Sequence, residues 1–158
     1  MLTEFLLGVT LIGAEWVLYV LVVMSFVSLA LIGERIVFYR RAAQNRKALQ
    51  QALADDGEEG LRVHLERNLT MLASIGSNSP FIGLFGTVLG IIRAFHELSG
   101  DLTGGADVVM GAISEALVAT AVGIFVAIPA LWAYNSFMRK TEQLFALAVG
   151  AGGKPAED

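Results

Sequence analysis

Three polar side chains stand within the most apolar stretches of this sequence, and their types allow them to bind or relay an ion. Glu115 and Thr120 lie in "ISEALVATAVGIFVAIPALWAYN", residues 113–135, and Thr87 lies in residues 68–92. A carboxylate near the centre of a membrane-spanning helix costs roughly 2.5–3.5 kcal/mol on insertion scales. Because something must offset that cost, Glu115 indicates a polar interior rather than a lipid-facing surface.

Each of these residues also has a purely structural interpretation. Glu115 can serve as a partner for Arg93, which lies near the outer end of the preceding span. A threonine in a membrane helix commonly donates its hydroxyl to the carbonyl four residues earlier, which would make Thr87 and Thr120 ordinary helix residues. On an ideal helix Glu115 and Thr120 differ by roughly 140°, so both cannot point straight into one narrow pore.

The remaining reactive residue types argue against other classes of protein. The sequence contains no cysteine, and its two histidines, His64 and His96, lie far apart. These residues make no spaced metal cluster, and no nucleophile–base arrangement is evident, so we expect no enzyme, no metal and no cofactor. A small secondary transporter should show repeat symmetry, and the sequence has no repeat. We also expect no nucleic-acid partner.

Composition and the lengths of the apolar runs predict an all-α membrane protein with three transmembrane helices. The 158-residue chain is 55% hydrophobic and only 16% charged, whereas soluble chains average about 25% charged residues. Each apolar run reaches the length of a membrane-crossing helix, although the second needs its weaker first half to do so. The predicted organisation is an outer or interfacial segment 1–15, transmembrane helix 16–34, cytoplasmic helical loop 35–68, transmembrane helix 69–95, short outer loop 96–107, transmembrane helix 108–135 and cytoplasmic tail 136–158.

The loop 35–68 is rich in residues that favour helix, and "DDGEEG" interrupts it at Gly57 and Gly60, which predicts a helical hairpin. The distribution of Lys and Arg predicts the orientation. Residues 1–33 contain none, residues 34–68 contain seven and residues 136–158 contain three, so ten of the eleven lie on one side of a three-span protein. The positive-inside rule then places the N-terminus in the periplasm and the C-terminus in the cytoplasm.

Small residues recur every three or four positions in the second and third spans, a pattern that lets membrane helices pack closely. The spacing alone supports packing within one three-helix subunit and assembly of several subunits into a ring about equally. We expect Pro80 and Pro129 to kink their helices. The predicted packing residues are Gly83, Gly86, Gly90, Gly111, Ala119, Gly123 and Ala127.

Two long motifs carry a resemblance to a known family. "SPFIGLFGTVLGIIRAF" and "GAISEALVATAVGIFVAIPALWAYN" resemble the signature helices of the ExbB/TolQ/MotA family of proton-driven inner-membrane motors, and look closest to ExbB and TolQ. MotA is a poorer match, because it has four spans and a large cytoplasmic domain. Through this resemblance Thr87 and Thr120 match the pore-facing threonines of the family. Glu115 matches its third-helix glutamate, and all three are assigned to the ion pathway.

The resemblance implies a subunit of the bacterial inner membrane that forms a homo-oligomer, a pentamer, around a single-span partner of the ExbD/TolR kind. That partner carries an intramembrane aspartate, and proton flow drives mechanical work across the periplasm. A TonB-like, TolA-like or gliding-machinery protein is the further partner that the resemblance implies. The alternative function is a passive helical scaffold in the lipid bilayer that conducts no ion.

Overall fold

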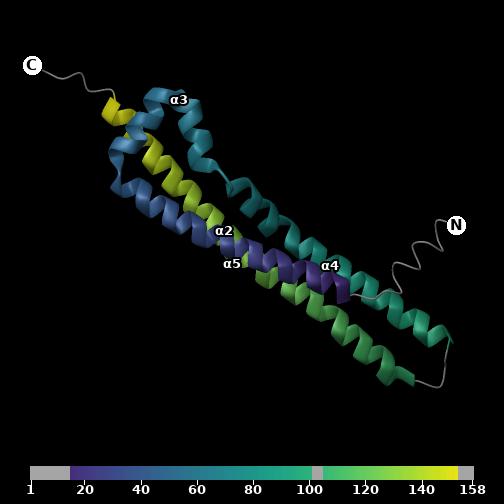
Figure 1. Ribbon diagram of the computed structural model, residues 1–158. Coiled ribbons are helices and arrows are strands. Elements are labelled where there is room, and N and C mark those ends of the chain that lie inside the picture. Colours follow the sequence, from purple (N-terminus) through teal and green to yellow (C-terminus); the bar gives the residue numbers. More distant parts are fainter. Residues whose placement is uncertain (1–14, 101–104, 153–158) are drawn as a thin grey trace, which may run out of the picture. The chain divides into compact units, whose positions relative to one another are not determined.

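The computed structural model describes residues 15–100 and 105–152, and these residues form four α-helices (Figure 1). The helices are α2 (Glu15–Gln44), α3 (Arg46–Glu66), α4 (Leu69–Gly100) and α5 (Gly105–Gly152). The prediction of a helical protein is therefore confirmed over the described residues. Three of the predicted segments lie partly outside the described residues. They are the segment 1–15, of which only residue 15 is described, the loop 96–107 and the tail 136–158.

The helices include three candidate membrane spans, which confirms that part of the prediction. The spans fall within Glu15–Gln44, Lys47–His96 and Val109–Gly150. At a rise of about 1.5 Å per residue, a helix of roughly 20 apolar residues crosses the hydrocarbon core. The helices continue beyond the predicted spans, because the charged segments that follow are still rich in good helix formers such as Ala, Leu and Glu.

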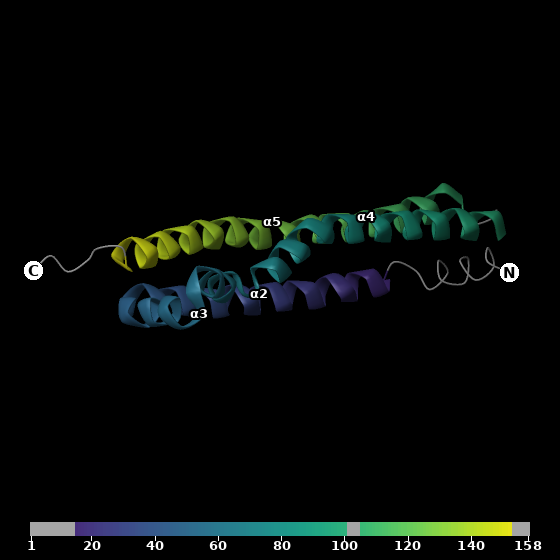
Figure 2. The ribbon, with the colours of Figure 1, turned by 90° about the horizontal axis from the view of Figure 1, so that it is seen from above.

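The chain divides into two compact units, and α2, α4 and α5 each contribute residues to both. Unit 1 comprises the described residues up to Val27 together with 75–100 and 105–129, and unit 2 comprises 28–74 and 130–152. In unit 1, α4 and α5 run side by side in both ribbon views (Figures 1 and 2). The start of α2 packs against them through a core of Val17, Leu21 and Leu89, surrounded by Met24, Ile82 and Val122.

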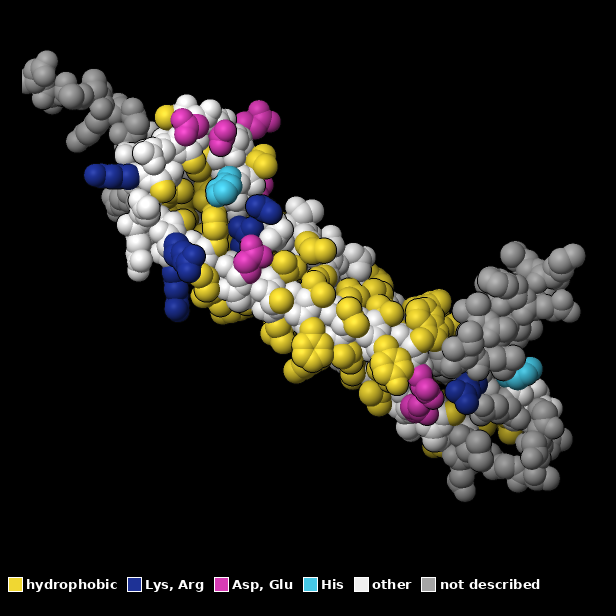
Figure 3. All heavy atoms as spheres, in the orientation of Figure 1, with side chains coloured by type: hydrophobic (Ala, Val, Ile, Leu, Met, Phe, Trp, Pro, Cys, Tyr) yellow, Lys and Arg dark blue, Asp and Glu magenta, His cyan; other side chains and the backbone are white. Residues whose placement is uncertain are grey.

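Large apolar side chains remain exposed on unit 1, and they cover much of its visible face (Figure 3). In unit 1, Phe81 and Phe125 have exposed fractions of 69% and 74%. Trp132, in the part of α5 that belongs to unit 2, is similarly exposed at 73%. A water-facing protein seldom leaves contiguous apolar patches of this kind, which mark contacts with lipid or with another chain. The exposed apolar surface therefore agrees with a membrane-spanning segment.

In unit 2, α3 consists of two helical pieces that meet at Gly57, which has φ 71° and ψ −175°. Glycine has no Cβ, so it reaches this left-handed region without the steric cost that other residues incur. The first piece begins at an N-cap, Asn45, whose side-chain oxygen accepts a hydrogen bond from the Ala48 N–H at 3.2 Å. Acidic side chains gather around the bend in α3 (Figure 3).

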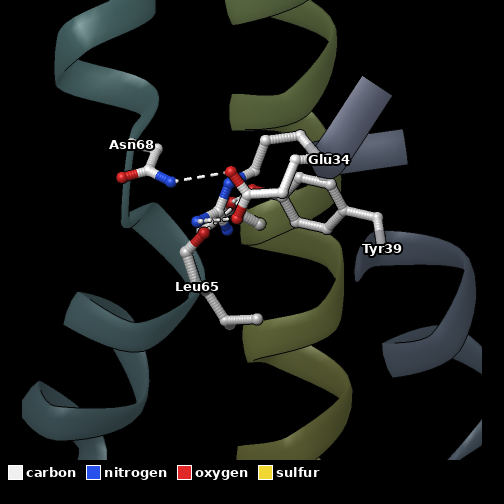
Figure 4. A network of polar contacts seen from close by, with 6 residues as sticks. Glu34, Tyr39, Leu65 and Asn68 are labelled. Atoms are coloured by element: carbon white, nitrogen blue, oxygen red, sulfur yellow. Dashed lines mark hydrogen bonds and ion pairs between the residues drawn. The ribbon is translucent and has the colours of Figure 1, made fainter. Parts of the chain in front are cut away.

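A buried polar network joins α2, α3 and α5 in unit 2 (Figure 4). The Tyr39 hydroxyl donates to the Leu65 carbonyl at 2.9 Å and lies 2.7 Å from the Thr141 hydroxyl. Because the tyrosine has one proton and gives it to Leu65, the Thr141 hydroxyl is the donor in the second bond. The Asn68 side-chain amide donates to the Glu34 carboxylate at 3.0 Å. Asn68 lies between α3 and α4 with a positive φ of 64°, and this hydrogen bond helps to hold it in that conformation.

Candidate functional site

The backbones of α4 and α5 approach one another in unit 1 at two glycines. A Cβ placed on Gly83 would stand 2.6 Å from the Ala119 carbonyl oxygen, and one on Gly123 would stand 2.5 Å from the Ser79 carbonyl oxygen. Both distances are well below the 3.4 Å at which ordinary contact begins, and the atoms met belong to the backbone. Gly83 and Gly123 therefore allow the two helices to touch main chain to main chain.

The other predicted packing residues lie in different surroundings. A Cβ on Gly86 would meet the Ala119 Cβ of α5 at 2.9 Å and Val17 of α2 at 3.0 Å. The lack of a side chain at Gly86 therefore lets both α5 and α2 pack closely against α4. Gly90 and Ala127 are buried, whereas Gly111 is exposed and has open space where a Cβ would lie. The structure thus gathers most of the predicted residues at the α4–α5 contact and leaves Gly111 at the surface of the single chain.

The close glycine contact brings Thr87 of α4 against Thr120 of α5, one helical turn beyond Gly83. Their hydroxyl oxygens lie 2.5 Å apart, and the Thr87 hydroxyl also lies 3.1 Å from the Ala116 carbonyl and 3.3 Å from the Gly83 carbonyl. Thr87 is buried and Thr120 is half-buried. The pair is therefore a hydrogen-bonded junction between two helices.

The directions of these hydrogen bonds follow from counting protons. Each threonine hydroxyl has one proton to donate and two lone pairs that accept. When Thr87 gives its proton to a carbonyl, the shared bond must be donated by Thr120. Both hydroxyl protons are then in use, and the remaining capacity of the pair is to accept a hydrogen bond from another donor.

Glu115 lies on a different face of α5 from the threonine pair. Its side chain is exposed, whereas Ala116 is buried and supplies the carbonyl that Thr87 approaches. The angle of roughly 140° between Glu115 and Thr120 on an ideal helix accounts for this separation. The structure therefore brings Thr87 and Thr120 together and places Glu115 where lipid, water or another chain would meet it.

Two prolines and one buried serine also lie in α4 and α5. Pro80 and Pro129 both lie inside helices, and neither proline ends its helix. Ser79 was not among the predicted residues; it is fully buried, donates its hydroxyl to the Ile75 carbonyl at 2.5 Å and presents its own carbonyl to Gly123. Its position directly before Pro80 in an apolar helix is the signal that would have drawn attention to it.

The chemistry available at the α4–α5 contact is that of hydroxyls and main-chain carbonyls, and the Glu115 carboxylate lies on another face of α5. Such groups accept and donate hydrogen bonds to water, a hydrated proton or a neighbouring carboxyl group. Among the described residues, no group of three or more His, Cys, Asp or Glu side chains is placed to hold a metal ion. The arrangement suits proton or water contacts better than bond-making chemistry.

Comparison with known proteins agrees with this assignment of chemistry. Residues 24–148 match the model of a family described as the MotA/TolQ/ExbB proton channel family. The chain is similar to the biopolymer transport protein ExbB of Helicobacter pylori, with 42% identity over 131 residues, which cover 82% of this chain and 83% of that protein. The matched region includes all of α4 and α5 as far as residue 148, with the glycine contact and the threonine pair.

Other relatives match over shorter stretches. The Tol-Pal system protein TolQ of Pseudomonas aeruginosa is 43% identical over 98 residues, which cover 62% of this chain and 40% of that protein. An ExbB of Neisseria meningitidis serogroup B is 56% identical over 78 residues, 48% of this chain and 34% of that protein. The chain thus spans most of the Helicobacter pylori relative but less than half the length of these two.

Proposed function

Because this chain belongs to the MotA/TolQ/ExbB proton channel family, we propose that it is a channel subunit coupling proton flow to mechanical work. It is a multi-pass membrane protein of an energy-transducing complex. The observation that carries the proposal is the Thr87–Thr120 junction, a polar contact between two apolar helices inside the region that matches the family. The junction provides hydrogen-bond acceptors at the depth of a membrane span.

In the proposed mechanism, a carboxyl group from another chain approaches the threonine pair. Neither predicted span 69–95 nor 108–135 contains an aspartate, and Glu115 is the acidic residue well inside them. A protonated aspartate on a single-span ExbD/TolR-like partner would donate to the free lone pairs of Thr87 and Thr120. Loss of its proton would break that contact and release the partner to the next equivalent one.

The energy available suits this kind of movement. A proton that crosses a potential of about 150 mV releases roughly 3.5 kcal/mol. That amount biases movement between discrete, equivalent contacts in a ring. We therefore infer a homo-oligomer, a pentamer by family resemblance, that encloses the partner, with Glu115 on the ion path or its polar gate.

The charge distribution supports an orientation for this complex. Ten of the eleven Lys and Arg residues follow the first span or the third, which places the N-terminus in the periplasm and the C-terminus in the cytoplasm of a bacterial inner membrane. The output would pass to a TonB-like, TolA-like or gliding-machinery protein. The buried network of Tyr39 and Thr141 then stabilises the cytoplasmic part.

A passive scaffold is the second candidate, and one observation favours it. Both hydroxyl protons of the threonine pair are used inside the single chain, so the pair also serves as a lock between α4 and α5. A lock requires the two hydrogen bonds for stability, whereas an ion path requires the hydroxyl groups for activity. The two functions therefore predict different results for the same substitutions.

The test uses the complex purified with the single-span ExbD/TolR-like partner that the proposal requires. Thr87→Val combined with Thr120→Val, and separately Glu115→Ala, should assemble as the parent does but lose proton-dependent work in cells and proton uptake in liposomes. Ser136→Ala is the matched control, because Ser136 only donates to its own helix at the Trp132 carbonyl, 2.8 Å away. Variants that assemble and retain full proton-dependent activity would refute the ion path, whereas a threonine variant that no longer assembles would favour the scaffold.

A further inference from the structure

Unit 2 contains a groove between α2 and α5 that is open to the surface and is lined in part by Tyr39 of the polar network. Its volume is about 300 Å³, and α2 lines it with Tyr39, Arg40 and Ala43. The lining residues from α5 are Lys140, Gln143, Leu144 and Leu147. Arg40, Lys140 and Gln143 are exposed, and Leu147 is half-exposed at 50%. The groove is therefore an apolar surface bordered by two cations.

The helix α3 of the same chain packs elsewhere on α2 and α5. His64 contacts the ring of Phe38 with 5.5 Å between ring centroids, and the Arg62 guanidinium lies 5.8 Å from the centroid of the Phe145 ring. Neither Phe38 nor Phe145 is among the residues that line the groove. These two contacts with α3 are made by residues outside the groove, although Tyr39, which lines the groove, also donates its hydroxyl to the Leu65 carbonyl of α3.

The bend in α3 presents the opposite charge. Asp55, Asp56, Glu58 and Glu59 flank Gly57, and all four side chains are exposed. The left-handed backbone of Gly57 separates the two helical pieces and sets these carboxylates at the end of each piece. Unit 2 therefore carries an acidic surface at the bend in α3 and, at a different place, the apolar groove bordered by two cations.

From this charge complementarity we propose that the acidic bend of one copy of the chain docks in the α2–α5 groove of the next copy. The carboxylates contact Arg40 and Lys140, and Leu147 is covered by the neighbouring α3. Such a contact joins two different surfaces, which is the head-to-tail type that closes into a ring. The inference rests on the homo-oligomer in the proposed function, and it adds a specific interface and its register.

Cysteine cross-linking tests the proposal cleanly, because the chain has no native cysteine. Glu59→Cys combined with Gln143→Cys, oxidised in native membranes with the partner present, should give a ladder of covalent multimers up to the size of the ring. Each single-cysteine variant should give at most dimers. Glu59→Cys with Glu142→Cys is the matched control, since Glu142 is exposed on α5 but does not line the groove.

Charge reversal tests the chemistry of the same contact. In the cross-linking background, Arg40→Glu with Lys140→Glu should reduce the ladder by about tenfold, because like charges then face one another. Adding Asp55→Lys and Asp56→Lys should restore it. Arg139→Glu, an exposed cation outside the groove, should leave the ladder intact, and high salt should weaken the parent contact.

Native mass spectrometry separates this proposal from the proposed function. An intact ring without the Glu59–Gln143 ladder overturns the docking contact and leaves the channel function standing. Cross-linking of Gln143→Cys to the single-span partner also overturns it, since the groove then belongs to that chain. Monomers in the membrane would contradict the ring itself and therefore both proposals.

Discussion

The substitution Gly83→Ala, or Gly123→Ala, should separate α4 from α5 and break the threonine junction. A Cβ at Gly123 falls short of ordinary contact with the Ser79 carbonyl by about 0.9 Å, and one at Gly83 falls short by about 0.8 Å. The obstructing atoms are backbone, which no side-chain rotation can remove. The helices must therefore move apart by most of that shortfall.

The expected cost follows from two opposing effects. Forcing an extra methyl group into a packed contact costs about 1–3 kcal/mol, and alanine returns roughly 0.5–1 kcal/mol over glycine inside a helix. The net destabilisation is about 0–2.5 kcal/mol. A separation of about 0.9 Å would also lengthen the Thr87–Thr120 contact from 2.5 Å beyond the roughly 3.0 Å limit of an O–H···O hydrogen bond.

Thermal unfolding of the purified complex measures the loss of stability, and proton-dependent work in cells measures the effect of lengthening the Thr87–Thr120 contact. Gly33→Ala is the control, because a Cβ at Gly33 meets nothing within 4 Å, so it should be neutral or stabilising. Gly83→Ala and Gly123→Ala should lower the unfolding midpoint by a few degrees and reduce activity together. If both variants are stabilised as Gly33→Ala is, the close backbone contact is refuted.

Three further predictions concern unit 2 and topology. Tyr39→Phe should cost about 1–3 kcal/mol in thermal unfolding, because it leaves a buried carbonyl without its donor, whereas Tyr19→Phe at a 71% exposed position should cost little. Arg35→Met should be neutral or stabilising, since the Nε and Nη1 atoms of the buried Arg35 guanidinium have no acceptor; a large loss of stability would show that an acceptor binds them. Cysteine at Thr103 should react with an impermeant maleimide from the periplasm and cysteine at Asp56 only after the membrane is permeabilised, and the reverse pattern would invert the topology.

The helices were predictable because long apolar runs and good helix formers act locally. The same patterns placed Gly83, Gly86, Ala119 and Gly123 in helices with a small-residue face, which the structure uses at the α4–α5 contact. The ends of the helices were less predictable. An apolar run shows where lipid can surround a chain, but α5 continues to Gly152 because nothing in its charged segment stops a helix.

The details of the site depended on contacts that sequence spacing does not contain. The Thr87–Thr120 hydrogen bond joins residues 33 positions apart, and it depends on which faces of two helices meet. The surroundings of Glu115 are not set by contacts within the chain, because the residue is exposed. The Tyr39–Thr141 bond, across 102 positions, was likewise beyond any local pattern.

The main-chain contact between Gly83 and Gly123 has a mechanical consequence. Packed helices usually shift past one another by small rearrangements of the side chains between them. At this contact there is no side chain to rearrange, since backbone atoms of α4 meet backbone atoms of α5. Within unit 1, α4 and α5 should therefore move together as one rigid body. A displacement of Thr87 would then displace Thr120 by the same amount. Spin labels at the exposed Phe85 and Phe125 would then report a single narrow distance distribution at every stage of the working cycle.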